Sequence, residues 1–238
     1  QMGMLPKIFP PYPDRNDVDL HAILHPAKEV GGDLYDFYMD GNHLYFLIGD
    51  VSGKGVPASL FMAITRSLFR TLSQHVLSPA KIVTEMNNSI SDNNESNMFV
   101  TLIVGILDLE TGILKLCNAG HNPPILIYPD GQVSYLEFKT QIFVGVVEDF
   151  KYSDEEVVLE KESKLFLYTD GVTEAENINK ELYGEEKLLE MLSDNASSDV
   201  RTTVNVVVDS IASHVKEAEA SDDLTILLIQ YEPGTANS

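Results

Sequence analysis

The feature that most constrains the fold is a series of strand-like segments joined only by short turns. Four such segments lie between residues 98 and 138, and Glu110-Thr111-Gly112 and Asp130-Gly131 mark two of the turns. Parallel strands need a crossover connection of a dozen or more residues, whereas strands joined by a tight turn pair antiparallel. The sequence therefore predicts a meander of antiparallel strands over this region.

The predicted helices are grouped and do not alternate strictly with strands. Apolar residues at four-residue spacing, from Leu60 to Leu72, predict a helix over residues 56–76, and Ser78-Pro79 opens a second helix. Further helices are expected near 185–193 and 199–217, and further strands at 153–160, 164–170 and 224–230. Grouped strands with grouped helices indicate an α+β fold. Nine or more strands are too many for one comfortable twisted sheet, so we expect two stacked antiparallel sheets with helix pairs outside, a four-layer α-β-β-α sandwich.

A hairpin predicted over residues 33–50 brings two carboxylates together. If Gly41 and Asn42 form the loop, Asp33 stands directly opposite Asp50, and if Asp40 and Gly41 form it, the two aspartates are diagonal neighbours. A three-residue loop would place them on opposite faces. On one face, two like charges about 4 Å apart repel by roughly 4 kcal/mol at an effective dielectric constant near 20. Either two-residue loop therefore predicts a positive group between the two side chains.

Two other strand ends carry aspartates. Asp170 ends the apolar segment 164–170, and Asp222 and Asp223 precede the segment 224–230. In an antiparallel sheet the end of one strand neighbours the start of the next, so these carboxylates can share a rim with Asp33 and Asp50. Taken singly, an aspartate before glycine is commonly a turn residue. Four coincidences at strand ends favour a site for Mg²⁺ or Mn²⁺, because hard ions prefer oxygen ligands.

The segment "IGDVSGKGVPAS", residues 48–59, does not match a nucleotide-binding loop. A P-loop requires four residues between its first glycine and its Gly-Lys-Ser/Thr, whereas only three residues separate Gly49 from Gly53, and Gly55 follows Lys54. Gly53 and Gly55 are expected to let the chain leave a strand and enter a helix. Lys54 is expected at the surface or at the helix start.

Charge and cysteine content exclude several classes of function. The 238 residues include 37 acidic and 16 basic ones, for a formal charge of −21, which argues against nucleic acids and anionic membranes as partners. The one cysteine, Cys117, fits a reducing, cytoplasmic compartment. No apolar segment reaches the ~20 residues of a membrane span, and no signal peptide is recognisable.

We expect a single domain over residues 1–238, because no linker-like or low-complexity segment divides the chain. The first residue is Gln, which is typical of a fragment of a longer protein. The first ~20 residues are expected to be a linker from an upstream domain, and the last ~6 a tail.

Five motifs give the chain a family resemblance. The segments "VGGDLYDFY", "GDVSGKGVPASLFMA", "NAGHNPP", "LYTDGVTEA" and "SDDLTILLI" occur in this order between residues 30 and 229. Together they resemble the bacterial branch of the metal-dependent PP2C-type (PPM) serine/threonine phosphatases, the stage II sporulation protein E and RsbU subfamily. The resemblance covers nearly the whole chain and implies the same sandwich of two antiparallel sheets between helix pairs.

The resemblance also implies roles for the aspartates. Asp50 would bridge two Mn²⁺ or Mg²⁺ ions, and the backbone carbonyl of Val51 would add a ligand. Asp170 and Asp222 would bind one ion, and Asp33 would hold the other, partly through water. These four aspartates are accordingly the expected catalytic residues.

Other positions have weaker expected roles near the substrate. Asp223 is a less certain ligand, and Ser52 and Gly53 follow the bridging aspartate, where eukaryotic members carry a histidine two residues after it. The arginine that grips phosphate in those members has no obvious counterpart here. His121 and Asn118 of "NAGHNPP" are candidates for contact with substrate, although a histidine in such a turn is more often structural.

The resemblance implies that the protein hydrolyses phosphoserine or phosphothreonine on a regulatory protein through water activated by two metal ions. The expected substrate is a phosphorylated STAS-type anti-anti-sigma factor, and an upstream sensor or receiver domain is expected in the full-length chain, with a homodimer as one assembly it allows. One alternative is a catalytically degenerate phosphatase fold that docks a STAS-type partner. A structural calcium site is a weaker alternative, because no EF-hand spacing is present.

Overall fold

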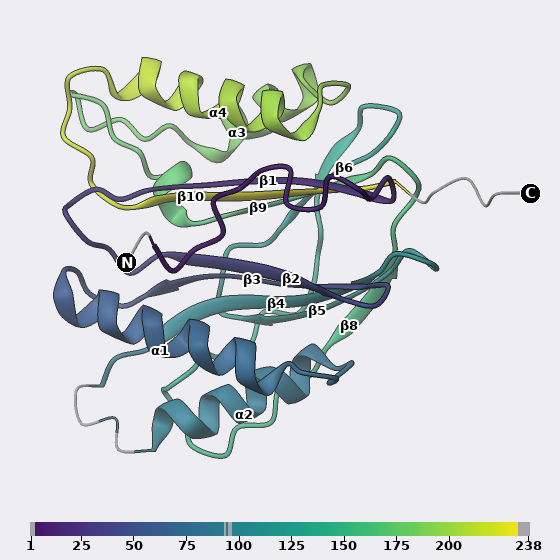
Figure 1. Cartoon of the computed structure of the whole chain (residues 1–238). Helices are drawn as coiled ribbons and strands as arrows, with labels where there is room; N and C mark the ends of the chain where they lie inside the picture. Colours follow the sequence, from purple (N-terminus) through teal and green to yellow (C-terminus); the bar gives the residue numbers. More distant parts are fainter. Residues whose placement is uncertain (1–2, 93, 95–96, 233–238) are drawn as a thin grey trace, which may run out of the picture.

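The computed structural model describes residues 3–92, 94 and 97–232, and it has four layers. Figure 1 shows helices α3 and α4 over one sheet and helices α1 and α2 under the other, with the two sheets stacked between them. The strands of the first sheet, in spatial order, are β1 (Val18–His25), β10 (Leu224–Tyr231), β9 (Lys164–Tyr168), β6 (Ile125–Ile127) and β7 (Val133–Tyr135). Those of the second are β2 (Leu34–Asp40), β3 (His43–Val51), β4 (Val100–Asp108), β5 (Ile113–Ala119) and β8 (Glu155–Val158). The predicted α-β-β-α sandwich is confirmed.

The helices lie close to their predicted positions. They are α1 (Val56–Leu72), α2 (Pro79–Ser91), α3 (Glu185–Asp194) and α4 (Val200–Val215), and a short 3-10 helix, η1 (Asp170–Val172), follows β9. Ser78 caps α2, since its side chain accepts a hydrogen bond from the backbone N–H of Lys81. In the described part of the chain, no helix combines the length and the apolar character needed to cross a bilayer.

The hairpin of β2 and β3 has the first of the two registers considered. Asp40 pairs with His43 and Leu34 with Gly49, so the loop consists of Gly41 and Asn42. Gly41 takes the left-handed backbone conformation, with φ of 60°, that such a tight turn requires. Continued by one residue, this register places Asp33 opposite Asp50.

The predicted meander is wrong at one connection. Strand β5 pairs with β4 and β6 pairs with β7, but β5 and β6 lie in different sheets. The chain crosses between the sheets at residues 120–124, where Gly120 has φ of 78° and Pro123 and Pro124 lack the N–H groups that would continue a ladder. The sheets are therefore linked by the same "NAGHNPP" segment that contains His121.

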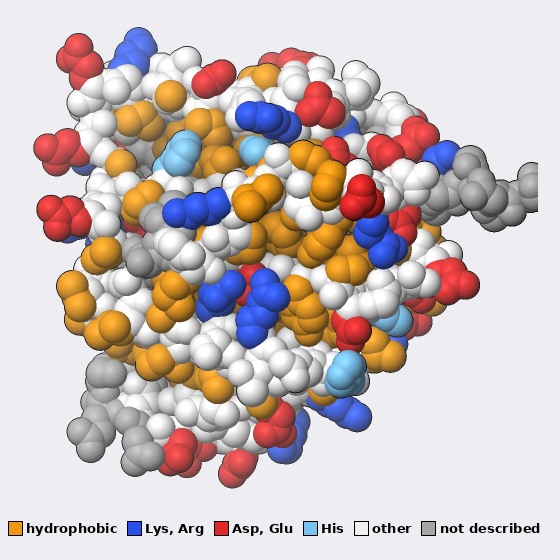
Figure 2. All heavy atoms as spheres, in the orientation of Figure 1, with side chains coloured by type: hydrophobic (Ala, Val, Ile, Leu, Met, Phe, Trp, Pro, Cys, Tyr) orange, Lys and Arg blue, Asp and Glu red, His pale blue; other side chains and the backbone are white. Residues whose placement is uncertain are grey.

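Helix α1 buries only part of the apolar stripe that the sequence indicated, since Leu68 and Leu72 pack against the core but Leu60 and Ile64 do not. Its buried residues are Ala58, Met62, Thr65 and Phe69, whereas Leu60 and Ile64 are 62% and 55% exposed. A strict spacing of four residues drifts around a helix of 3.6 residues per turn, so the stripe from Leu60 to Leu72 cannot stay against the sheet. Figure 2 accordingly shows hydrophobic side chains gathered at the surface over α1.

The N-terminal segment packs onto the sandwich. Strand β1 begins at Val18 and pairs with β10 along its whole length, and Leu5 is buried. The backbone carbonyl of Pro6 accepts a hydrogen bond from the Tyr35 hydroxyl at 2.6 Å. The linker predicted for the first ~20 residues thus includes the start of a strand, and the single-domain organisation stays a prediction. The predicted tail, residues 233–238, lies outside the described residues.

Candidate functional site

The four predicted aspartates come from both sheets. Asp33 immediately precedes β2 and Asp50 is the penultimate residue of β3, whereas Asp170 opens η1 directly after β9 and Asp222 lies just before β10. Their side chains are close enough to interact, because Asp170, Asp222 and Asp33 each affect the pKa of Asp50. The structure therefore brings the predicted residues to one region between the sheets.

Asp33, which is buried, and Asp50, which is partly buried, form a carboxyl pair. Asp33 is 1% exposed, and its Oδ2 accepts hydrogen bonds from the hydroxyls of Thr169 at 2.7 Å and Thr225 at 2.5 Å. Burial, followed by the charge of Asp50, raises the pKa of Asp33 well above its usual range. Burial, followed by the charges of Asp170 and Asp222, raises the pKa of Asp50 to about 7, while a side-chain hydrogen bond with Asp33 opposes that rise. The pair therefore attracts a proton or a cation.

Asp170 and Asp222 form the more open side of the region. Burial and then the charge of Asp222 raise the pKa of Asp170. The Asp222 side chain is 41% exposed, and its Oδ2 lies 2.9 Å from the ammonium group of Lys54, which also donates to the backbone carbonyl of Ser221 at 2.7 Å. Lys54 is exposed, as expected, but its contact with Asp222, which places it at this rim, was not predicted from the sequence.

The donor chemistry fits a divalent cation such as Mg²⁺ or Mn²⁺. The carboxylates supply only oxygen atoms, and burial, followed by the neighbouring negative charges, raises the pKa of Asp50. In the described residues, however, no group of three or more His, Cys, Asp and Glu side chains already has an arrangement that could hold a metal ion. Asp222 contacts Lys54 instead, so ion binding at Asp222 has to compete with that ammonium group.

Asp223 supports the loop that precedes Asp33. It is 6% exposed, and its carboxylate accepts hydrogen bonds from the backbone N–H groups of Ala27 at 2.9 Å and Asp33 at 3.4 Å. A Cβ atom on Gly31 would lie 1.6 Å from Asp223 Oδ2, so only glycine fits there. Asp223 therefore positions Asp33 through the backbone.

Backbone contacts and conformation explain why Ser52 and Gly53 follow Asp50. The Ser52 hydroxyl accepts a hydrogen bond from the backbone N–H of Phe99 at 2.9 Å. Gly53 has φ of 88°, the left-handed conformation that releases the chain from β3 toward α1. A Cβ atom on Gly32 would lie 2.7 Å from the carbonyl oxygen of Val51, so that glycine lets two segments approach closely.

His121 and Asn118 have structural contacts. His121 is 3% exposed; its Nε2 lies 3.1 Å from the Tyr168 carbonyl oxygen and its Nδ1 2.8 Å from the Thr101 hydroxyl. A carbonyl can only accept, so Nε2 carries the proton and Nδ1 accepts from Thr101. Burial lowers the pKa of His121 to about 4. The Asn118 side chain closes the turn by bonding the backbone N–H and carbonyl of His121.

A second buried aspartate lies nearby on β2 and was not singled out from the sequence. Asp36 is fully buried, and its carboxylate accepts from Arg70 Nε and Nη2, both at 2.6 Å, and lies 3.0 Å from Arg66 Nε. Both arginines belong to α1. This ion-pair cluster ties the helix that follows Asp50 to the strand that follows Asp33. The four-residue spacing of Arg66 and Arg70, which places both on one face of a helix, could have indicated a buried acidic partner.

Comparisons with known proteins identify the family of the chain. Residues 40–232 match the family described as stage II sporulation protein E (SpoIIE). The chain is 27% identical to "Phosphoserine phosphatase RsbU" of Bacillus subtilis over 92% of its own length and 64% of that protein. It covers 38%, 53% and 36% of the lengths of three further curated relatives. The chain therefore spans less than two thirds of the length of each of these four relatives.

Solved structures share the fold. The SiaA-PP2C domain of Pseudomonas aeruginosa superimposes with a TM-score of 0.81 at 22% identity, over 90% of this chain and 86% of that one. RsbX, solved in complex with magnesium, superimposes with a TM-score of 0.69 at 18% identity, over 90% of this chain and 96% of that one. The fold resemblance drawn from the five motifs is confirmed.

Proposed function

Because this chain belongs to the stage II sporulation protein E (SpoIIE) family, we propose that it is a metal-dependent protein phosphatase acting on phosphoserine or phosphothreonine of a regulatory protein. The observation that carries the proposal is the pair of buried Asp33 and partly buried Asp50, set beside Asp170 and Asp222. The name of RsbU, a phosphoserine phosphatase, supports the same reaction class.

The residues that would hold two Mg²⁺ or Mn²⁺ ions are Asp33, Asp50, Asp170 and Asp222, with the carbonyl of Val51. When bound, such ions lower the pKa of a water molecule and neutralise charge on a phosphoryl group during in-line displacement. Magnesium in the structure of the related RsbX supports this choice of metal.

The chain's own residues orient the carboxylate of Asp33 and exclude water from it. Thr169 and Thr225 fix one oxygen of the Asp33 carboxylate, and burial keeps the Asp33 side of the pair away from bulk solvent. Lys54 brings a positive charge to the rim, where a phosphoryl dianion would approach. Preorganised charges of this kind are worth more in a partly dry site than in water.

The proposed substrate is a phosphorylated STAS-type anti-anti-sigma factor, controlled through an upstream sensor or receiver domain. The resemblance drawn from the five motifs, together with the name of RsbU, a phosphoserine phosphatase, motivates this proposal.

Hydrolysis of p-nitrophenyl phosphate and of a phosphoserine peptide, each with MnCl₂ or with EDTA, tests the activity. We expect turnover only with manganese, and loss of turnover to background in Asp50→Asn and Asp170→Asn. Asp209→Asn, which changes an exposed aspartate of α4, is the matched control and should retain activity. Full activity in both Asp50→Asn and Asp170→Asn would refute the assignment.

A degenerate binding module is the second candidate. The contact between Lys54 and Asp222, together with the lack of a preformed metal-binding group in the described residues, favours it. It predicts that the protein binds the phosphoserine peptide equally well with EDTA and hydrolyses neither substrate with manganese. Fluorescence anisotropy of the labelled peptide separates the two functions.

A further inference from the structure

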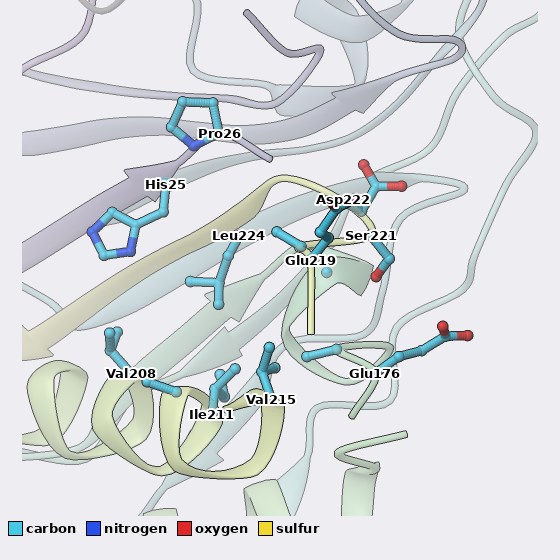
Figure 3. Close-up of a pocket in the computed structure, with 14 residues that line it drawn as sticks. His25, Pro26, Glu176, Val208, Ile211, Val215, Glu219, Ser221, Asp222 and Leu224 are labelled. Carbon is cyan, nitrogen blue, oxygen red and sulfur yellow. The ribbon is translucent and has the colours of Figure 1, made fainter. Parts of the chain in front are cut away.

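A groove opens beside the candidate metal centre and is not used by the proposed reaction. It has a volume of about 210 Å³ and lies between helix α4, the end of β1 and the start of β10. Figure 3 shows Val208, Ile211 and Val215 of α4 facing Leu224 across it. Because these side chains are apolar, the groove suits an apolar ligand group.

The groove adjoins the aspartate rim. Asp222 lines both this groove and the small hollow that contains Asp50 and Lys54. Gly171, which follows Asp170, also lines the groove. An extended peptide advances by about 3.3 to 3.6 Å per residue, so a side chain one or two residues from a phosphoserine held at the rim can reach it.

The size of the groove matches one large side chain. A volume of about 210 Å³ accommodates a side chain such as leucine, methionine or phenylalanine, but not a folded element. Complete burial of such a side chain strengthens binding roughly tenfold to a hundredfold. The groove can therefore contribute to the choice of substrate.

The charges around the groove favour a basic partner segment. The carboxylates of Glu176, Glu219 and Asp222 belong to lining residues, and no lysine or arginine is among the described residues that line the groove. Lys180 contacts Glu176 at 2.7 Å and Lys54 contacts Asp222 at 2.9 Å, so two of the three charges are partly offset from outside. The balance is still negative, in a chain of formal charge −21.

We propose that this groove is a substrate subsite, which binds an apolar side chain beside the phosphoserine of a protein segment that also carries lysine or arginine. The inference rests on the proposed phosphatase function and adds a substrate preference to it. It assigns to α4 a role in recognition that the metal-binding aspartates do not supply.

The test compares three phosphoserine peptides with p-nitrophenyl phosphate. The first peptide carries leucine on both sides of the phosphoserine and lysine at its ends, the second replaces leucine with serine, and the third replaces lysine with glutamate. Ala212→Trp fills the groove from an exposed position on α4. Ser213→Trp adds the same bulk at the next residue, which is exposed and does not line the groove, and serves as the matched control.

In the wild-type protein with manganese, we expect kcat/KM for the leucine-lysine peptide to exceed that for either other peptide by about tenfold or more. Ala212→Trp should lose the preference for leucine over serine, Ser213→Trp should keep it, and all three proteins should hydrolyse p-nitrophenyl phosphate equally. Equal rates for the leucine and serine peptides, equal rates for the lysine and glutamate peptides, or a preference that survives in Ala212→Trp, would overturn the proposal.

Failure of the proposed phosphatase function gives a different result, namely no hydrolysis of p-nitrophenyl phosphate by any of the three proteins. The subsite is then tested by anisotropy of the labelled peptides. Binding of the leucine-lysine peptide that is about tenfold tighter than that of the serine peptide, and that is lost in Ala212→Trp, supports the groove. Equal affinities overturn it.

Discussion

Two buried aspartates on one short segment have opposite surroundings. Asp36 points to α1, where Arg66 and Arg70 neutralise it. Asp33, an odd number of residues away and so on the other face of the strand, meets threonine hydroxyls and the carboxyl group of Asp50. A charge that is matched by the protein's own cations holds the fold together. A carboxylate that faces another carboxylate destabilises the folded state. We interpret the pair of Asp33 and Asp50 as a site for a cation that the protein itself does not supply.

The largest expected effect is on the free energy of unfolding, and it should differ between substitutions of Asp36 and of Asp33. Asp36→Asn should lower the free energy of unfolding by about 3 kcal/mol, because two arginines lose their buried counter-charge, although Arg70 is partly exposed. Asp33→Asn should change it by no more than about 1 kcal/mol without metal, because an amide oxygen still accepts from the threonines and repulsion with Asp50 disappears. Urea unfolding in EDTA measures both. Equal losses would break the comparison.

The next effect concerns the response to metal. Manganese at a hundred times its dissociation constant should stabilise the wild-type protein by about 2.7 kcal/mol, since ligands that bind only the folded state add to its stability. Asp33→Asn and Asp50→Asn should lose this gain, whereas the control Asp209→Asn should keep it. Unfolding with and without MnCl₂ is the measurement. A gain that persists in both site variants would mean that manganese binds elsewhere.

A smaller effect is expected at Lys54, which gives the rim a partial internal counter-charge. Lys54→Gln should bind manganese up to about fivefold more tightly, because an exposed ion pair is worth at most about 1 kcal/mol and no longer competes for Asp222. Lys54→Arg keeps the charge and is the matched control. Calorimetric titration with MnCl₂ measures the affinities, and weaker binding by Lys54→Gln would show that the lysine assists the metal instead.

The smallest effect is expected at His121, a buried base that has neither a counter-charge nor a titration near neutral pH. Its pKa of about 4 in the folded protein lies below the ordinary 6.5, so protonation favours the unfolded state. Its contribution to stability is complete above about pH 6.5 and is lost as the pH falls toward about 4. NMR should show unchanged His121 ring signals between pH 6 and 8. A His121 titration near pH 7 would reopen a role as proton donor.

Local sequence signals predicted the features that depend on local geometry. The Asp40-Gly41-Asn42 turn limited the hairpin to a few registers, and the observed one places Asp33 against Asp50. This prediction succeeded because a tight turn determines the pairing of the two strands that it joins.

Features that depend on tertiary packing were missed. Lys54 reaches Asp222 only because Gly53 and Gly55 turn the chain, and the angles of that turn are not determined by the residue types alone. The pairing of Arg66 and Arg70 with Asp36 depends on which face α1 presents to the sheet, and four-residue spacing wrongly placed Leu60 and Ile64 on that face. Thr169 was not predicted as a site residue, although its hydroxyl donates a hydrogen bond to Asp33 from the opposite sheet.

Anomalous diffraction at the manganese edge, from crystals soaked in MnCl₂, tests the central claim most directly. The account predicts strong peaks between the carboxylates of Asp33 and Asp50 on one sheet and those of Asp170 and Asp222 on the other, and none beside Asp36. A map with no peak among these four aspartates at saturating manganese would contradict it.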